Sequence, residues 1–406
     1  MVNVGIDLHK TQFTTCVRKK SGNEFEQYPT TAEGYMAFLA KAAEWQSNGE
    51  EVRVGVESTG NTRYFKSRME AAGIGVTVIN TLKFKVVNES VNKTDKHDAA
   101  TIAEFLELGI LPEAHLCSQK HEQMRRLLKV RTTLVRAQVV IKNQIHALFT
   151  AEGLEDVTGG ELQSKKGRQR VLNALNQWEN GLVVQPLVET IERLDENVKR
   201  IEKELRLLAA GDRVVELLMT IPGCGEIGAW TIGAYTGDIK RFASAKKYAA
   251  YAGLVPWVQN SNETIRHGKI TKRGPQELRT ALVQLVMGLR RMKAKTNTWR
   301  IMQRYELMKK SKSHPGVKII AAARKIATMI WHMLSEDAEF EVAKMVDRKL
   351  VVVSESMRMD ALLVQEAMEE AKEEGKEKEE EPVIVRVVEK GVRKTGVAGK
   401  KLKKVG

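Results

Sequence analysis

Two aspartates three residues apart stand at the start of a predicted helix, where their type and spacing could hold a metal ion. They are Asp95 and Asp98, within residues 92–100. Thr94 is a good helix N-cap, and apolar residues then recur at helical spacing up to Leu106. Residues three apart share a helix face, so two carboxylates held there repel unless a cation neutralises them. An isolated pair is also typical of a solvated first turn, where the helix dipole favours negative charge.

Two further acids end predicted strands. Residues 2–7 alternate and are rich in β-branched side chains, which predicts a first strand ending at Asp7; residues 51–57 predict a fourth strand ending at Glu57. In an RNase H-like fold these strands are neighbours at the sheet centre, so Asp7 and Glu57 would lie side by side beneath the helix that begins at Asp95. Four converging carboxylates suit Mg²⁺. A pair of such ions can activate a nucleophile and stabilise the leaving oxygen in phosphoryl transfer.

Two histidines stand close to these acids in the sequence. His9 follows Asp7 by two residues, and His97 lies between the two helical aspartates. Either could contact a phosphate or a metal ion. A histidine exposed to solvent is the commoner outcome for such positions, and we expect it for both.

The predicted strands and helices that must position these acids divide the chain into three regions and a tail. Residues 1–120 read as a three-strand meander followed by alternating helices and strands, which predicts an α/β domain with a mixed sheet. Residues 121–212 contain two long amphipathic runs, which predict a helical arm. That arm is either a protruding coiled coil used for dimerisation or ordinary bundle packing. Residues 213–338 predict a mainly α domain, and residues 339–406 a charged tail with at most one helix.

A glycine turn joins two predicted helices early in the 213–338 region, in the pattern of a helix-hairpin-helix motif. Gly223 and Gly225 would let backbone N–H groups at the start of the second helix approach a phosphate without side-chain obstruction. A tight helix–helix turn without a ligand fits the pattern equally well. Further on, residues 258–274 are polar and basic, and we expect them to form a loop.

The composition favours a large acidic partner. The net charge is +15 over 406 residues, which makes nucleic acid the default candidate. A membrane is not expected, because no apolar run approaches the length that spans a bilayer and the N-terminus lacks the pattern of a signal peptide. Three scattered cysteines argue for a reducing compartment and against a zinc site. We therefore expect a cytoplasmic, nucleoid-associated protein.

Six motifs occur in the order found in one known family. They are residues 5–10 (GIDLHK), 56–60 (VESTG), 93–99 (KTDKHDA), 221–225 (IPGCG), 251–256 (YAGLVP) and 272–274 (KRG). Over residues 2–335 the chain resembles the DEDD transposases of insertion sequences, which are related to Piv DNA invertases and of which some members are guided by a bridge RNA. The resemblance implies a RuvC-like N-terminal domain whose metal-binding acids are Asp7, Glu57, Asp95 and Asp98. It also implies a helical C-terminal transposase domain whose serine attacks the DNA phosphate.

The resemblance places that serine at Ser261, in a polar segment shortly before the KRG motif. The family has glycine after the serine, whereas this chain has Asn262, a residue that tolerates positive φ better than most. Ser244 is the alternative nucleophile, although we expect it to be a helix N-cap. Basic residues around Ser261 would position phosphates, or would form a solvated loop. These are Arg266, His267, Lys269, Lys272 and Arg273.

The expected function is that of a DNA recombinase that excises and inserts its own mobile element by Mg²⁺-assisted serine attack. The family resemblance implies a homo-oligomer, a dimer or tetramer, and a structured guide RNA. The alternative is a RuvC-like metal-dependent nuclease of the junction resolvase type, in which water attacks and no covalent intermediate forms. A third class, a catalytically silent nucleic-acid-binding protein, is disfavoured by the four intact acids.

Overall fold

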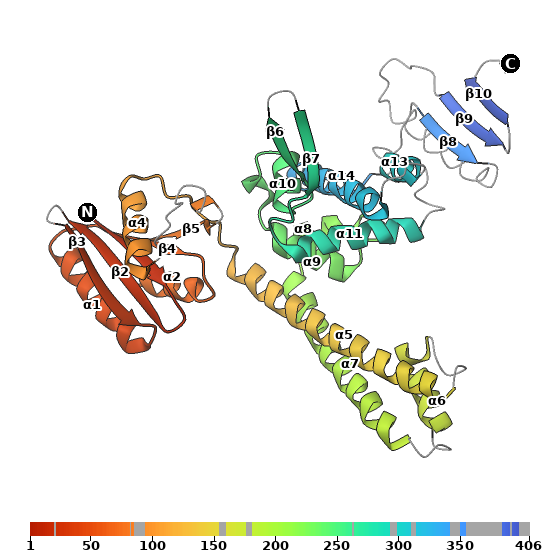
Figure 1. Cartoon of the computed structure of the whole chain (residues 1–406), viewed down its shortest axis with the longest axis horizontal. Coiled ribbons are helices and arrows are strands. Elements are labelled where there is room, and N and C mark those ends of the chain that lie inside the picture. The colour runs from red at the N-terminus through yellow and green to blue at the C-terminus, as the bar shows by residue number, and fades with distance from the viewer. Residues whose placement is uncertain are drawn as a thin grey trace. The chain divides into compact units, whose positions relative to one another are not determined.

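The chain divides into two compact units, Met1–Cys117 and Ser118–Gly406, which are described separately (Figure 1). The computed structural model describes residues 1–19, 22–81, 83–84, 94–153, 160–175, 181–261, 264–292, 299–309, 314–341, 350–354, 384–389 and 392–397. Among these residues, no helix combines the length and apolar character that a bilayer-spanning segment needs.

The first unit is built on a five-stranded mixed sheet with the order β3-β2-β1-β4-β5. Its strands are β1 (Val2–Leu8), β2 (Gln12–Lys19), β3 (Gly22–Pro29), β4 (Val52–Glu57) and β5 (Gly75–Ile79). The pairs β1–β2 and β2–β3 are antiparallel, whereas β1–β4 and β4–β5 are parallel. The predicted mixed α/β sheet is confirmed, and β1 and β4 are neighbours at its centre.

Three helices pack on this sheet: α1 (Ala32–Ser47), α2 (Thr62–Glu70) and α4 (Asp95–Glu107). One face of the central strands carries a continuous apolar row that joins aromatic residues of α1 and α2 in a single core. This row consists of Val4, Ile6, Leu8, Val54 and Val56. The alternate residues of the same strands point to the opposite face, which α4 covers.

Glycines at equivalent positions of the two central strands allow α4 to come unusually close. A Cβ on Gly5 would lie 2.0 Å from the backbone oxygen of Ala99 and 2.3 Å from the backbone nitrogen of Ala103. A Cβ on Gly55, the partner of Gly5 in the sheet register, would lie 2.8 Å from Ile102 Cγ2. The α4 backbone therefore rests directly on the backbone of β1.

The second unit begins with two long helices, α5 (Gln119–Ala151) and α7 (Gly181–Ala209), which pack side by side (Figure 1). Arg131 Nε lies 2.8 Å from Glu202 Oε1, and Gln138 Nε2 donates to Asp195 Oδ1 at 2.7 Å. Seven residues forward along α5 thus correspond to seven residues back along α7, so the pair is antiparallel. The predicted pair of long helices is confirmed; its use for dimerisation stays a prediction.

The connection between these helices contains more structure than the sequence suggested. It holds η2 (Glu161–Gln163) and the helix α6 (Lys165–Leu175), within a segment where the sequence indicates only a connection containing Gly, Lys and Arg, residues 153–170. The buried Arg168 explains the difference, because its guanidinium lies 2.8 Å from Asp195 Oδ2 and donates to the backbone oxygen of Leu162. Arg168, a basic residue of this connection, thus attaches α6 to α7.

The rest of the second unit is mainly helical, as predicted. Its helices are α8 (Arg213–Met219), α9 (Glu226–Thr236), η3 (Ile239–Arg241), α10 (Ala245–Tyr251), α11 (Gln276–Arg291), α13 (Arg300–Lys309) and α14 (Pro315–Ser335). They share a large apolar core in which Trp230, Tyr248 and Trp299 are buried. Met124 and Leu128 of α5 belong to the same core, so the first turns of that helix are built into the domain.

Two segments differ from the secondary structure that we expected. Residues 258–274 are largely an antiparallel hairpin, β6 (Pro256–Ser261) and β7 (Thr264–Ile270), and not a loop. The tail, expected to hold at most one helix, contains a sheet of the strands β8 (Leu350–Ser354), β9 (Ile384–Glu389) and β10 (Val392–Val397) in the order β10-β9-β8. Both predictions gave too much weight to charge and too little to short β-branched runs such as Val351–Val353.

The contact between α4 and β1 generates a stability prediction. Gly5→Ala should lower the free energy of unfolding by about 3 kcal/mol or more, because the new methyl group overlaps backbone atoms that move only with the whole helix. Gly55→Ala should cost less, since its nearest neighbour is the tip of a side chain. Thermal and urea unfolding of the full-length variants would measure both.

The matched control for these variants is Gly75→Ala. Gly75 also lies in a strand of the same sheet, but an added Cβ there would meet no atom within 4 Å. Its free energy of unfolding should change by less than about 0.5 kcal/mol. Equal stabilities of Gly5→Ala and Gly75→Ala would contradict the close packing of α4 on β1.

Candidate metal centre on the central strands

Asp7 and Glu57 lie at the ends of the two central strands. The parallel register pairs Ile6 with Val56, so the next positions, Asp7 and Glu57, stand side by side where the strands end. Asp7 is buried, and Glu57 is partly buried. Because side chains alternate between faces, both acids belong to the face that Gly5 and Gly55 open to α4.

Asp95 and Asp98 lie in the first turn of α4. Thr94 is the N-cap of this helix, as predicted, and its hydroxyl accepts a hydrogen bond from the backbone N–H of His97 at 3.2 Å. The capped start fixes where the helix begins, and the contact with Gly5 fixes how deep it lies on the sheet. Together these features place the acidic first turn of α4 beside the end of β1.

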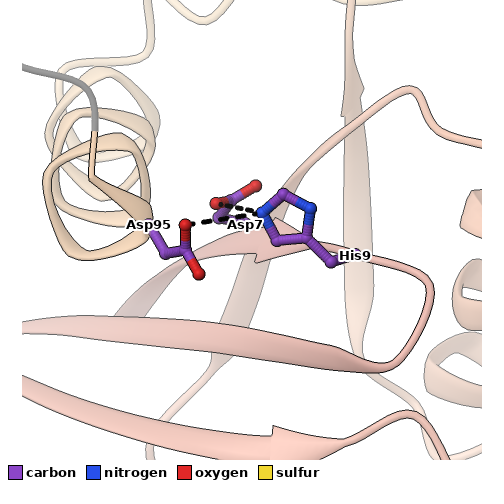
Figure 2. Close-up of side chains that lie close together, drawn as sticks. All are labelled: Asp7, His9 and Asp95. Carbon is purple, nitrogen blue, oxygen red and sulfur yellow. Dashed lines mark hydrogen bonds and ion pairs between the residues drawn. The ribbon is translucent and has the colours of Figure 1, made fainter.

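His9 completes a compact cluster with Asp7 and Asp95 (Figure 2). His9 Nε2 lies 3.0 Å from Asp7 Oδ2 and 3.6 Å from Asp95 Oδ1. One ligand atom from each of the three residues lies within 4.8 Å of the others. Of the four predicted acids, Asp7 and Asp95 belong to this cluster, whereas Glu57 and Asp98 are not part of it.

The electrostatics of Asp7 favour a cation. Burial raises the pKa of its carboxyl group above the usual value, and the negative charges of Asp95 and Asp98 raise it further. The charge and hydrogen bond of His9 act in the opposite direction without cancelling the rise. An ionised Asp7 is therefore costly in the protein alone, and a positive ion at the cluster would lower that cost.

The position of His9 comes from a tight turn between β1 and β2. The His9 backbone N–H donates to Gln12 O at 2.9 Å, and Asn61 Nδ2 donates to His9 O at 3.0 Å. We expected His9 to be a solvent-exposed histidine, and its side chain is indeed about half exposed, yet it faces the acids. The overlooked signal is its spacing, because residues two apart at the end of a strand project from the same face.

The two candidate serines occupy different structural positions. Ser244 is the N-cap of α10, as expected, and its hydroxyl accepts a hydrogen bond from the Lys247 N–H at 3.4 Å. Ser261 is the last residue of β6, and its register partner is Thr264. Asn262, on which the comparison with the family's glycine depends, lies outside the described residues.

The basic motif after the hairpin packs against the motif that precedes it. A Cβ on Gly274 would lie 1.8 Å from Tyr251 O, and a Cβ on Gly253 would lie 2.5 Å from Arg273 O. The YAGLVP and KRG motifs are thus held backbone to backbone at the base of the hairpin. Lys269, Lys272 and Arg273 are exposed there, and Arg266 lies on β7.

The predicted glycine turn joins α8 to α9. Gly223 has a left-handed φ of 81°, and Gly225 is the N-cap of α9 without a side-chain hydrogen bond. The turn borders a cavity of about 620 Å³ between α5, α9 and α11, whose lining includes Lys129 and Arg136 of α5. A glycine turn between two helices is present, whereas the helix-hairpin-helix motif and phosphate binding by the turn stay predictions.

Comparisons with known proteins match both parts of the chain. Residues 4–152 match the DEDD transposase domain of IS110 elements, and residues 215–302 match the family described as Transposase IS116/IS110/IS902 family. The chain is 26% identical to the transposase for insertion sequence element IS1328 of Yersinia enterocolitica over 341 residues, which cover 83% of this chain and 98% of the relative. A probable family 20 transposase of Pseudomonas aeruginosa is 25% identical over 70% of this chain and 84% of its own length.

A third relative is a DNA-inverting protein. The pilin gene-inverting protein of Moraxella bovis is 23% identical over 83% of this chain and 97% of its own length. The DEDD match implies an RNase H-like fold for the first unit, in agreement with the central pair β1–β4. The chain therefore belongs to the IS110/IS116/IS902 family of DEDD transposases, which are enzymes acting on DNA.

Proposed function

We propose that this transposase excises and inserts its own mobile element, with a divalent cation, Mg²⁺ in the first instance, bound at the β1–α4 cluster. The observation that carries the proposal is the convergence of Asp7, His9 and Asp95 in the DEDD domain. Ligands about 2.1 Å from an octahedral ion stand roughly 3.0 Å apart when adjacent and about 4.2 Å apart when opposite. The distances of 3.0 and 3.6 Å from His9 Nε2 to the two carboxylates fall in this range.

The residues of the cluster would have distinct tasks. Asp7 and Asp95 would hold the cation, and Glu57 and Asp98 would complete its carboxylate surroundings from the end of β4 and the next position of the α4 turn. A cation bound there would stabilise negative charge on the phosphoryl oxygens of the DNA. The buried position of Asp7 keeps its carboxylate away from bulk water, which strengthens its interaction with positive charge.

The proposed nucleophile is Ser261. Attack by its Oγ on a DNA phosphate would form an Oγ–P bond, break a P–O bond of the DNA backbone and release a deoxyribose hydroxyl group. The hydroxyl proton of Ser261 would pass to a general base. Support comes from the position of Ser261 at the end of β6, on a hairpin whose base exposes Lys269, Lys272 and Arg273. Together with Arg266 and the glycine turn at Gly223 and Gly225, these cations would bind DNA phosphates.

We further propose that the enzyme acts as a homo-oligomer, a dimer or tetramer, with a structured guide RNA. The net charge of +15 agrees with binding of DNA and of RNA alike, because each cationic contact with a phosphate releases counterions. The competing function is a metal-dependent nuclease. The cluster of Asp7, His9 and Asp95 favours that reading in one respect, since a bound cation could activate water without any serine.

Removal of one carboxylate tests the metal centre. Asp95→Asn should reduce strand cleavage and joining by at least about 10²-fold, because loss of even an outer-shell partner commonly costs 10- to 100-fold. DNA binding, measured by gel shift, should remain. The matched control is Glu107→Gln on the same helix, whose carboxylate pairs with Arg18 and not with the cluster. Full activity of Asp95→Asn would refute the assignment.

A covalent adduct distinguishes the two mechanisms. End-labelled DNA carrying an element junction would be incubated with the protein, its co-expressed flanking RNA and Mg²⁺, and analysed on a denaturing gel. We expect a protein-linked DNA band that disappears in Ser261→Ala and persists in Ser244→Ala, where only a helix cap is lost. Cleavage without a protein-linked band in any variant would show that the enzyme is a metal-dependent nuclease that forms no covalent intermediate.

Burial of the Asp7 carboxylate predicts that removing its charge stabilises the fold, although the same change should impair metal binding. The carboxyl pKa is raised in the folded protein, so protonated Asp7 contributes stability below the ordinary carboxyl pKa, and that stability is lost as the pH rises through the folded-state pKa. Asp7→Asn should therefore unfold at a higher temperature than wild type at pH 7.5 without divalent ions. The difference should shrink as the pH falls towards 4, where wild-type Asp7 becomes protonated. A lower melting temperature of Asp7→Asn at pH 7.5 would show that ionised Asp7 stabilises the fold.

A further inference from the structure

We propose that His9 is a direct ligand of the divalent ion and makes the site prefer a first-row transition ion, represented by Mn²⁺, over Mg²⁺. This inference rests on the proposed metal centre. It goes beyond the DEDD carboxylates, because it assigns a nitrogen ligand that the four acids do not supply. Its basis is the geometry of the β1–β2 turn and the composition of the cluster.

The geometry favours direct binding over a peripheral role. His9 Nε2 is the atom that joins the cluster, since it faces both Asp7 Oδ2 and Asp95 Oδ1, at 3.0 and 3.6 Å (Figure 2). The three donor atoms are mutually within 4.8 Å, so one ion can touch all three.

The backbone of the turn holds His9 independently of its contacts with the acids. Asn61 Nδ2 donates to the His9 carbonyl oxygen at 3.0 Å, and Asn61 Oδ1 in turn accepts from Thr59 Oγ1 at 2.8 Å. The next carbonyl of the turn, Lys10 O, accepts from Thr30 Oγ1 at 2.6 Å. With the His9 N–H bonded to Gln12 O, both backbone polar groups of His9 are fixed. The backbone that carries the imidazole is therefore already ordered before an ion binds, which lowers the entropic cost of binding.

The donor set determines the preference. Mg²⁺ favours oxygen ligands and keeps several waters, whereas imidazole nitrogen suits first-row transition ions. Mn²⁺ represents them in this test because it accepts carboxylates as Mg²⁺ does and tolerates a nitrogen ligand better. Two carboxylates and one imidazole therefore form a set that Mn²⁺ accepts fully and Mg²⁺ accepts less well. Replacing the nitrogen by an amide oxygen of similar reach, as in His9→Gln, should move the preference towards Mg²⁺.

The test measures metal binding on the full-length protein, separately from DNA chemistry. Titration with Mn²⁺, followed by the EPR signal of the free ion, gives a Kd, and competition with Mg²⁺ gives the selectivity. Pulsed EPR of bound Mn²⁺ detects a directly coordinated ¹⁴N nucleus. Wild type should show ¹⁴N coupling, and His9→Gln should lose it and lower the Mn²⁺/Mg²⁺ selectivity about 10-fold.

Two further variants serve as controls. His97→Gln removes a histidine from the same acidic turn that is exposed and outside the cluster, so coupling and selectivity should stay unchanged. Asn61→Ala removes the hydrogen bond to His9 O but leaves the imidazole, so it should retain ¹⁴N coupling with a several-fold weaker Mn²⁺ affinity. Retention of this coupling in Asn61→Ala together with its loss in His9→Gln supports His9 as the ligand.

The possible failures are distinguishable. Suppose that wild type binds Mn²⁺, that Asp95→Asn does not bind it, and that no ¹⁴N coupling depends on His9. The metal centre is then supported, and the proposed role of His9 as a ligand is overturned. If wild type binds no Mn²⁺, or if Asp95→Asn binds it as tightly, both the proposed centre and this inference fail.

Discussion

The candidate site depends on one steric constraint, the absence of a side chain at Gly5. The α4 backbone lies so close to β1 that a methyl group at this position would overlap Ala99 and Ala103. Only this depth allows the first turn of a helix to bring a carboxylate beside a strand-end acid, because the Asp95 side chain is short. The geometry of the candidate site is therefore set by a residue that has no functional group, two positions before Asp7.

The same closeness has an electrostatic cost. Asp7 is buried next to two further aspartates, whose negative charges raise the pKa of its carboxyl group. A domain selected only for stability would place an apolar or paired residue there. Like charges at a buried strand end are typical of functional sites, and they agree with the divalent metal that the DEDD family implies.

Local patterns predicted much of this architecture, and long-range contacts account for most of what they missed. The strands ending at Asp7 and Glu57 and the cap at Thr94 follow from alternation and capping, which are properties of neighbouring residues. Arg168 looked like part of a linker because its partner, Asp195, lies in another helix. His9 was assigned to solvent because its carboxylate neighbours come from two different elements. Membership of the DEDD transposases became clear only from six motifs considered together.

The antiparallel arm carries a consequence for how such enzymes diversify. Positions along α5 and α7 are matched one to one, as the pairs Arg131–Glu202 and Gln138–Asp195 show. Seven residues inserted into each helix at facing positions would lengthen the arm by about 10.5 Å and leave the contacts at both of its ends in register. An insertion in only one helix would break that match. The length of the arm can therefore change by paired seven-residue insertions or deletions while the contacts at both of its ends are kept.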